Sequence, residues 1–163
     1  MAAFKQCCSC FLVLLTIWCL FYTVTSSLVG GIQPIDDKDI AKYEDLLKGL
    51  ELAAVEVNRE IKEKMNDANS NRKYGFLKQT LHVSSQVVQG SLFHVTTDMA
   101  PSDCSDQDPK PILECSVDGS DPLVQTHTYS CTFKIWSREW LPPKEGLLVE
   151  DLKCTLKSAG GEI

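Results

Sequence analysis

The side chains best suited to chemistry in this sequence of 163 residues belong to eight cysteines and three histidines. Thiols can form disulfides, bind zinc or act as nucleophiles, and imidazoles can bind zinc or transfer protons. Four cysteines lie within the first 19 residues, and the other four are Cys104, Cys115, Cys131 and Cys154. The two groups lie in segments of different composition, so each is explained from its surroundings.

The first group lies in an apolar segment, residues 1–27. Lys5 is its only charged residue, residues 11–24 are almost entirely apolar, and three small polar residues follow. One positive charge, a short apolar core and small residues at a cleavage site are typical of a signal peptide. We therefore expect cleavage behind this segment and a secreted, extracellular chain of residues 28–163.

An uncleaved membrane anchor is the alternative explanation of this segment. A helix needs about 20 apolar residues to span a bilayer, and the run from Cys7 to Ser26 reaches that length if its polar ends are counted. In that case Cys7, Cys8 and Cys10 could carry acyl groups. The strongly apolar core is short, which favours the signal peptide.

The four remaining cysteines suit two disulfides, because an even number of cysteines in an exported domain usually pairs. A zinc site is the alternative, but these four include no CxxC pair, and His82, His94 and His127 do not stand near them at ligand spacing. We therefore expect no metal and no cofactor. Oxidised thiols are not nucleophiles, and no Ser/His/Asp order or Cys–His pair stands out, so we do not expect an enzyme.

The overall composition is that of a globular protein. Hydrophobic residues make up 44% of the chain and charged residues 23%. The formal net charge is −6, and the sequence contains no block of basic residues. This balance argues against a nucleic-acid-binding protein.

Residues 36–66 have the pattern of one long helix. Their apolar residues recur at spacings of three and four, which places them on one stripe. Acidic residues at the start favour a helix N-terminus, and a stretch rich in Asn and Asp ends the pattern. The stripe consists of Ile40, Tyr43, Leu46, Leu47, Leu50, Ala53, Ala54, Val57, Ile61 and Met65.

After the helix, apolar and polar residues alternate, which is the period of a strand. The first two strands join as a hairpin near Gly90, and a fifth, short strand is expected in residues 28–35. Residues 98–125 are rich in Asp, Ser and Pro, and we expect them to be irregular and constrained by a disulfide. The four main strands are expected at residues 76–85, 92–97, 126–137 and 148–156.

A helix with one apolar stripe and a sheet with one apolar face bury each other. We therefore expect an α+β domain in which one long helix packs across a four- to five-stranded antiparallel sheet. Cys131 and Cys154 fall on strands that we expect to be adjacent, which makes them one disulfide pair. Cys104 and Cys115 would then form the other and close the irregular segment.

Residues Gln86-Val87-Val88-Gln89-Gly90 read Gln-x-Val-x-Gly, which resembles the first-hairpin motif of the cystatin family. Leu28-Val29-Gly30-Gly31 resembles the family's N-terminal binding segment. Trp140 follows a strand, Cys131–Trp136, that is similar to the one before the family's second binding loop. The four cysteines match the order in the secreted, two-disulfide (type 2) branch. The resemblance therefore covers nearly all of residues 28–163.

The resemblance implies both a fold and a function. Members of this branch inhibit papain-like, cathepsin-type cysteine proteases reversibly and competitively. They fill the active-site cleft with the N-terminal segment and two hairpin loops, which lie side by side at one end of the sheet. In this chain, the protease-binding residues implied by the resemblance are Leu28, Val29, Gly30, Gln86, Val87, Val88, Gln89, Gly90 and Trp140.

The side chains in the two loops suit this role. Val87 and Val88 are apolar residues at an expected hairpin tip, and Gln86 can tie the turn through its amide. Gly90 permits a close approach, or a backbone angle closed to other residues, and Trp140 offers the large apolar surface common at interface centres. The alternatives are an ordinary hairpin with a valine in the core, and a Trp that caps the core.

The second loop departs from the family pattern. The family usually has Pro directly before the Trp, whereas this chain has Glu139, and Pro142 and Pro143 follow instead. The loop after Trp140 is also longer. These changes concern the geometry of the second loop and not the fold. Trp136 lies on the polar face of its strand, so we expect it to be partly exposed and not an anchor.

Two further possibilities follow from the resemblance. Some two-disulfide members also inhibit asparaginyl endopeptidases through an Asn in the turn after the helix. Asn71 is the candidate here, although Arg72 occupies a place that is usually acidic. The other possibility is a cystatin-fold binding or precursor module that does not inhibit proteases. Such modules usually lack the Gln-x-Val-x-Gly motif, so its presence favours an inhibitor.

Overall fold

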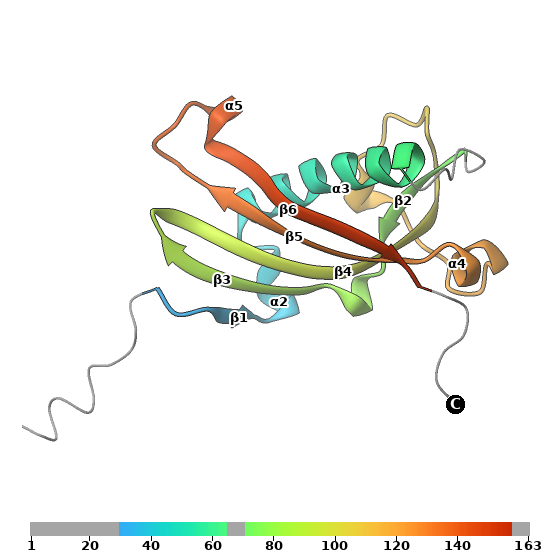
Figure 1. Ribbon diagram of the computed structural model, residues 1–163, viewed down its shortest axis with the longest axis horizontal. Coiled ribbons are helices and arrows are strands. Elements are labelled where there is room, and N and C mark those ends of the chain that lie inside the picture. Colours follow the sequence, from blue (N-terminus) through green and yellow to red (C-terminus); the bar gives the residue numbers. More distant parts are fainter. Residues whose placement is uncertain (1–29, 65–70, 158–163) are drawn as a thin grey trace, which may run out of the picture. The chain divides into compact units, whose positions relative to one another are not determined.

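A computed structural model describes residues 30–64 and 71–157 (Figure 1). The chain divides into Met1–Gly31 and Ile32–Ile163, and the fold belongs to the second of these units. The expected signal peptide, residues 1–27, lies outside the described residues. Within the described part of the chain, no helix combines the length and the apolar character needed to cross a membrane.

Six antiparallel strands form one sheet (Figure 1). Five of them follow the order β1-β3-β4-β5-β6, and β2 pairs with β4. β3 and β4 form the expected hairpin, in which Val88 pairs with Gly90 across the turn. The strands are β1 Gln33–Ile35, β2 Arg72–Phe76, β3 His82–Val88, β4 Gly90–Ser105, β5 Tyr129–Ser137 and β6 Leu147–Leu156.

The α+β class is confirmed, but the strand boundaries differ from those expected. The single strand predicted for residues 76–85 is wrong, because the 3₁₀-helix η1, Lys78–Thr80, separates β2 from β3. β2 itself was not expected. β4 continues to Ser105, through a segment expected to be irregular, because its second half pairs with β2.

The predicted single helix is interrupted near its start. It consists of α2, Asp37–Ile40, and α3, Glu44–Lys64, separated by residues 41–43. Two amides in this break bond to carbonyls three residues back, at 2.9 and 3.1 Å, which is a tighter turn than an α-helix makes. Ile40 and Leu46 are buried on either side of the break, so the apolar spacing runs through it and does not reveal it.

Helix α3 packs against the sheet, where it contacts β2, β5 and β6. The helix approaches the sheet closely at Gly49, where an added Cβ would lie 2.3 Å from Cγ2 of Ile135 in β5, so a larger residue would push the layers apart. Most of the predicted stripe is buried, but Tyr43 is 41% exposed and lies in the break before α3. Leu47 is partly buried, and Met65 lies outside the described residues. The stripe residues that are at most 1% exposed are Leu46, Leu50, Ala53, Ala54, Val57 and Ile61.

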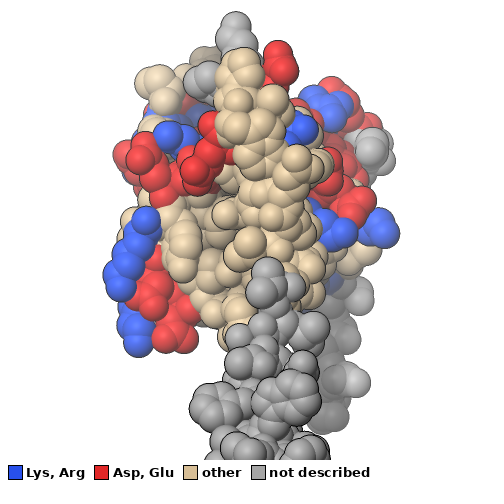
Figure 2. Space-filling view, turned by 90° about the vertical axis from the view of Figure 1, so that its left-hand side faces the viewer, with Lys and Arg blue, Asp and Glu red and all other residues tan. Residues whose placement is uncertain are grey.

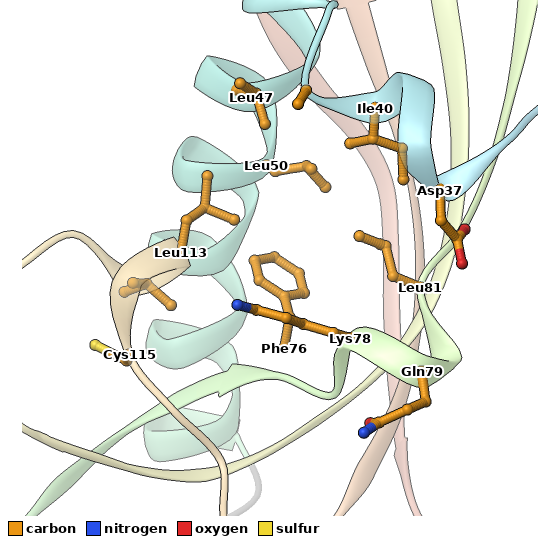
Figure 3. A pocket seen from close by; sticks show the side chains of 12 residues that line it. Asp37, Ile40, Leu47, Leu50, Phe76, Lys78, Gln79, Leu81, Leu113 and Cys115 are labelled. Carbon is orange, nitrogen blue, oxygen red and sulfur yellow. The ribbon is translucent and has the colours of Figure 1, made fainter.

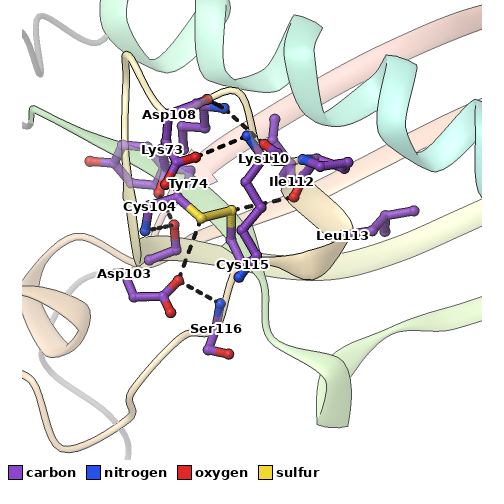
Figure 4. The surroundings of a disulfide bond; sticks show 12 residues. Lys73, Tyr74, Asp103, Cys104, Asp108, Lys110, Ile112, Leu113, Cys115 and Ser116 are labelled. Atoms are coloured by element: carbon purple, nitrogen blue, oxygen red, sulfur yellow. Dashed lines mark hydrogen bonds between the residues drawn. A yellow bond between two sulfur atoms is a disulfide. The ribbon is translucent and has the colours of Figure 1, made fainter.

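Two disulfides hold the sheet and the segment that joins β4 to β5. Cys131 and Cys154 are paired residues of β5 and β6, with Cα atoms 4.2 Å apart. Cys104 and Cys115 close the start of the connecting segment, with Cα atoms 5.7 Å apart (Figure 4). This is the pairing expected from the sequence. The segment is not irregular throughout, since it contains η2 (Ile112–Glu114) and α4 (Pro122–Thr126).

Hydrogen bonds attach this connecting segment to the rest of the fold. The carboxylate of Glu51 in α3 accepts bonds from the backbone amides of Ile112 (2.8 Å) and Leu113 (3.1 Å). Lys73 of β2 donates to the carbonyl of Lys110 at 3.0 Å (Figure 4). Because both anchors lie in the two main layers, the segment is held against helix and sheet.

A potential metal-ligand group lies in the same place. Asp103, Cys104 and Cys115 bring a carboxylate and two sulfurs within 4.8 Å of one another. The two sulfurs form a disulfide, and the Asp103 carboxylate accepts a hydrogen bond from the amide of Ser116 at 2.8 Å (Figure 4). These donors are therefore engaged in holding the segment and are not arranged as thiolate ligands.

Candidate functional site

Two connections of the sheet emerge side by side at one end. β4 pairs with β5 from Ser91 opposite Ser137, and β5 pairs with β6 from Ser137 opposite Leu147. The β3–β4 turn and the β5–β6 connection therefore leave neighbouring strands at the same level (Figure 1). We call residues 87–90 and 138–146 together the loop edge.

The β3–β4 turn carries two apolar side chains in solvent. Val87 is 67% exposed and Val88 is 39% exposed. The alternative of a valine buried in the core of an ordinary hairpin therefore does not apply. Their position at the end of β3 follows from the strand register, in which Val87 pairs with Ser91 directly before the turn.

Gly90 has two reasons to be glycine. Its φ is +95°, a conformation that residues with a Cβ rarely adopt. A Cβ at this position would also lie 2.2 Å from the carbonyl oxygen of Ser137 and 3.2 Å from two ring atoms of Trp140. The glycine thus lets the first turn approach the end of β5 and the second loop.

The β5–β6 connection presents Trp140 beside Gly90. Its side chain is 54% exposed, so it does not cap the core. The amide of Leu141 bonds to the carbonyl of Arg138 at 3.0 Å, which makes a tight turn around the Trp. The short helix α5, Pro143–Gly146, then leads into β6. Together with the two valines, the Trp ring forms an exposed apolar surface on the loop edge.

Trp136 and Arg138 connect the two loops. The sequence did not predict this connection. Nε1 of Trp136 donates a hydrogen bond to the carbonyl of Gln89 in the first turn, at 2.9 Å. The guanidinium of Arg138 lies over the Trp136 ring, 4.7 Å from its centroid. The available signal in the sequence was a Trp on the polar face of a strand next to a binding loop. Its partial exposure agrees with the expectation, but its contact with the turn could not be foreseen.

Gln86 contacts the neighbouring strand β4. Its side-chain oxygen lies 3.3 Å from Nε2 of His94 in β4. Gln89, at the tip, is exposed. Figure 2 shows this end of the molecule, where a band of uncharged residues runs through the middle and charged residues lie on its flanks. We call the exposed side chains of Val87, Val88 and Trp140 on the loop edge the apolar ridge.

The expected third binding segment is described only in part. Leu28 and Val29 lie outside the described residues. Gly30 has a φ of +96°, a backbone conformation that favours glycine. The contribution of this segment to binding stays a prediction.

Asn71 lies at the other end of the sheet from the loop edge. It precedes β2, whose first residue Arg72 pairs with Ser105 at the far end of β4, whereas the turn is at the near end, Gly90. The Asn71 carbonyl accepts a hydrogen bond from the amide of Asp106 at 3.0 Å. Its role toward asparaginyl endopeptidases stays a prediction.

A pocket of about 620 Å³ lies apart from the loop edge and shares no residue with it (Figure 3). Asp37 and Lys78 supply its charged side chains, and none of the three histidines lines it. It offers space for an apolar group and no paired acid and base. Its apolar lining consists of Ile40, Ala41, Leu47, Leu50, Phe76, Leu81, Ile112 and Leu113.

Comparison with known proteins gives the following relatives. No family model matches the chain. Cystatin-1 of Chilobrachys guangxiensis is 30% identical over 146 residues, which are 87% of this chain and 91% of that protein. A cystatin of Oxyuranus microlepidotus is 27% identical over 118 residues, 71% of this chain and 75% of the relative. Cystatin-C of Paralichthys olivaceus is 35% identical over 77 residues, 45% of this chain and 59% of the relative.

Among solved structures, dimeric human cystatin F aligns with 82% of this chain and 94% of its own, at 16% identity and a TM-score of 0.47. The assignment rests on the sequence relatives. Because the Chilobrachys protein shares 30% identity over 87% of this chain, the chain belongs to the cystatin family.

Proposed function

We propose that this chain is a secreted, reversible and competitive inhibitor of papain-like cysteine proteases. Cystatins are in general inhibitors of cysteine proteases. The observation that carries the proposal is the exposed apolar surface of Val87, Val88 and Trp140, from two loops that the sheet brings together at one end. The mature chain would begin at Leu28 after removal of the signal peptide, which agrees with its two disulfides.

An apolar ridge suits a protease cleft on energetic grounds. Fully burying one valine side chain contributes about 1.5–3 kcal/mol, and Trp is enriched among residues that dominate interface energies. The flanking charges (Figure 2) would lie at the rim of the contact, where they affect association rate more than affinity. The apolar centre of the ridge would thus supply most of the affinity, and the flanking charges would orient the inhibitor as it associates.

The backbone of the first turn explains why such an inhibitor would not be cleaved. A substrate has to lay an extended peptide bond across the catalytic Cys–His pair. Val88 and Gly90 are instead paired with each other across the turn, and the carbonyl of Gln89 accepts a hydrogen bond from Trp136. The turn would fill the cleft without offering a bond in the geometry required for attack.

An inhibition titration tests the proposal. Residues 28–163 should inhibit papain reversibly and competitively, and trypsin should be unaffected. Val87→Ser should raise the inhibition constant about tenfold, because it removes apolar burial of roughly 1.5 kcal/mol. Val55→Ser is the matched control, since Val55 is 51% exposed but lies on helix α3, and it should leave inhibition unchanged.

Absence of inhibition of any papain-like enzyme at micromolar concentration would contradict the proposal. The chain would then be a cystatin-fold binding or precursor module. A loss of inhibition in Val55→Ser as large as in Val87→Ser would show that the loop edge is not the contact surface. Circular dichroism of both variants checks that each remains folded.

A further inference from the structure

Trp136 and Arg138 join the two loops of the loop edge through a chain of contacts. Nε1 of Trp136 donates to the Gln89 carbonyl at 2.9 Å, and the Arg138 guanidinium stacks over the Trp136 ring at 4.7 Å. Nη2 of Arg138 donates to the carbonyl of Glu145, and the Arg138 amide donates to the carbonyl of Gly146 at 2.6 Å. This series of contacts therefore extends from the first turn to the far side of the second loop.

The register of β5 places these two side chains. Ile135 and Ser137 are buried, at 0% and 3% exposure, and Ile135 meets Gly49 of α3. Because successive side chains of a strand point to opposite faces, Trp136 lies on the face that α3 does not cover. There it pairs with Leu92 of β4 and is close enough to the turn to reach the Gln89 carbonyl.

The second loop has a particular need for such support. Glu139 stands directly before Trp140, so the fixed φ that a proline provides is missing there. Exposed loops with few core contacts open easily. Ordering them during binding costs free energy, whereas loops already held in the bound arrangement avoid that cost. Contacts that hold both loops therefore affect affinity without touching the protease.

We propose that Trp136 and Arg138 are positioning residues that couple the two loops into one rigid ridge. The effect of the coupling on affinity rests on the proposed protease inhibition, but the coupling itself is a property of the free protein. Arg138 holds the second loop through its bonds to Glu145 and Gly146. Its contact with the Trp136 ring links the second loop to the first turn. The Trp136 N–H is occupied by Gln89 and is not presented to a protease.

The test compares single and double variants of residues 28–163. Trp136→Phe removes the N–H and keeps a ring under the guanidinium, and Arg138→Ala removes the stacking and the bond to Glu145. Backbone ¹⁵N relaxation of the free protein reports order in residues 87–90, and progress curves with papain report inhibition. Arg59→Ala is the matched control, because Arg59 pairs with Glu56 and Glu63 on the surface of α3.

Each single variant should lower the order parameters of residues 87–90 and raise the papain inhibition constant about three- to tenfold, the size expected for one hydrogen bond. Arg138→Ala should lower order in the first turn through Trp136, because the contacts of the Arg138 side chain are with Trp136 and Glu145. In the Trp136→Phe background, Arg138→Ala should add little further loss of order in the turn, because the path is already broken. Arg59→Ala should change neither readout.

The outcomes separate this inference from the proposed function. If the unmodified chain does not inhibit papain, the proposed function fails, and the order parameters still decide the coupling. If both variants keep full order in residues 87–90, the coupling is overturned. If inhibition weakens while that order is unchanged, Trp136 or Arg138 contacts the protease directly, which also overturns a positioning role.

Discussion

At Gly90 the first turn approaches both the end of β5 and Trp140 of the second loop. Replacing it with Ala would place a Cβ 2.2 Å from the Ser137 carbonyl oxygen at a φ of +95°. The left-handed backbone alone costs a residue with a Cβ about 1–2 kcal/mol, and the contact forces the turn away from β5. Gly90→Ala should therefore lower the free energy of unfolding by at least about 1 kcal/mol in urea denaturation and weaken papain inhibition.

Gly119→Ala provides the control for this prediction. A Cβ at Gly119 meets nothing within 4 Å, and its φ is not in the left-handed region. Removing a glycine from such a position restricts the unfolded chain and is expected to leave stability unchanged or raise it by up to about 1 kcal/mol. Equal losses in the two variants would show that the special geometry of Gly90 does not matter.

Asp121 provides a prediction about pH. Its carboxylate accepts a hydrogen bond from the amide of Leu123 and pairs with Arg72 at 2.5 Å. First the bond to Leu123 and then Arg72 hold the pKa of Asp121 below its ordinary value. A lowered folded pKa means that this stabilisation is present above the unfolded pKa, about 3.9, and is lost as pH falls through the folded pKa.

Asp121→Asn should therefore reduce the free energy of unfolding near pH 7, because it removes the charge that Arg72 and the Leu123 amide stabilise. The difference from the unmodified chain should shrink below about pH 4, where the carboxyl of the unfolded chain is already protonated. Urea denaturation between pH 7 and pH 2 measures this difference. A difference that stays constant over that range would mean that Asp121 titrates alike in both states.

At the scale of elements, alternation of side chains decided what the sequence could predict. β5 has one buried face, which the alternation of Tyr129, Cys131, Phe133 and Ile135 in the sequence predicts. In β2, Tyr74, Gly75 and Phe76 are all buried in succession, because α3 contacts the strand and a Cβ at Gly75 would meet Val117 and Cys115. A strand covered on both faces has no period of two, so the pattern gives no signal.

The second half of β4 escaped prediction for the same reason. Residues 97–102 are buried without interruption and include Pro101, so the segment looked irregular. In the loop edge, the exposed valines and Trp140 could be expected from the resemblance. The bond from Trp136 to the Gln89 carbonyl could not, because it depends on the cross-strand register and not on a residue pattern.

The attachment of η2 to α3 through Glu51 is testable. In Glu51→Gln, one carboxylate oxygen is replaced by an amide NH2 group, which cannot accept the hydrogen bond from the backbone N–H of Ile112 or Leu113. A hydrogen bond to a charged group contributes about 1.5–3 kcal/mol, so the free energy of unfolding should fall by roughly that amount in urea. Hydrogen exchange should accelerate in residues 105–116.

Glu63→Gln is the comparison, since Glu63 pairs with Arg59 on the exposed side of the same helix. Exposed pairs contribute little, so this variant should unfold close to the unmodified chain. If the two Glu→Gln variants lose equal stability, the bidentate contact of Glu51 is not what holds η2.

At the scale of the whole domain, helix α3 separates the loop edge from Asn71. Asp45 at the start of α3 accepts a hydrogen bond at 2.6 Å from Ser137, the last residue of β5 before the loop edge. Asn71 follows the other end of the helix, and a helix of 21 residues spans about 32 Å. Charges are screened over about 8 Å at physiological salt, so the two ends should act independently.

Asn71→Lys should therefore leave papain inhibition unchanged, measured as the inhibition constant at physiological salt. If asparaginyl endopeptidases bind at Asn71, their inhibition should be lost in the same variant. A large loss toward papain would mean that the loop edge has been assigned to the wrong end of the sheet.

Removal of the N-terminal residues Leu28 and Val29 tests how the chain binds a protease, independently of its family. If Leu28 and Val29 fill apolar subsites beside the enzyme's cysteine, each contributes about 1.5–3 kcal/mol by burial. Ordering a free chain end costs about 0.5–1.5 kcal/mol for each immobilised side chain. The surplus for the two residues is then about 1–4 kcal/mol, which is roughly tenfold to a thousandfold in the inhibition constant.

A chain that begins at Gly31 should therefore dissociate from papain faster, because most interface changes act on the dissociation rate. The effect should be largest for enzymes with deep subsites, and dissociation measured by stopped flow for several papain-like enzymes would show this. Gly30→Val should act in the same direction, since a φ of +96° is unfavourable for a β-branched residue. The unfolding temperature should not change, because the end of a chain generally contributes little stability. If the shortened chain binds every enzyme as tightly as residues 28–163, the two loops carry the binding alone.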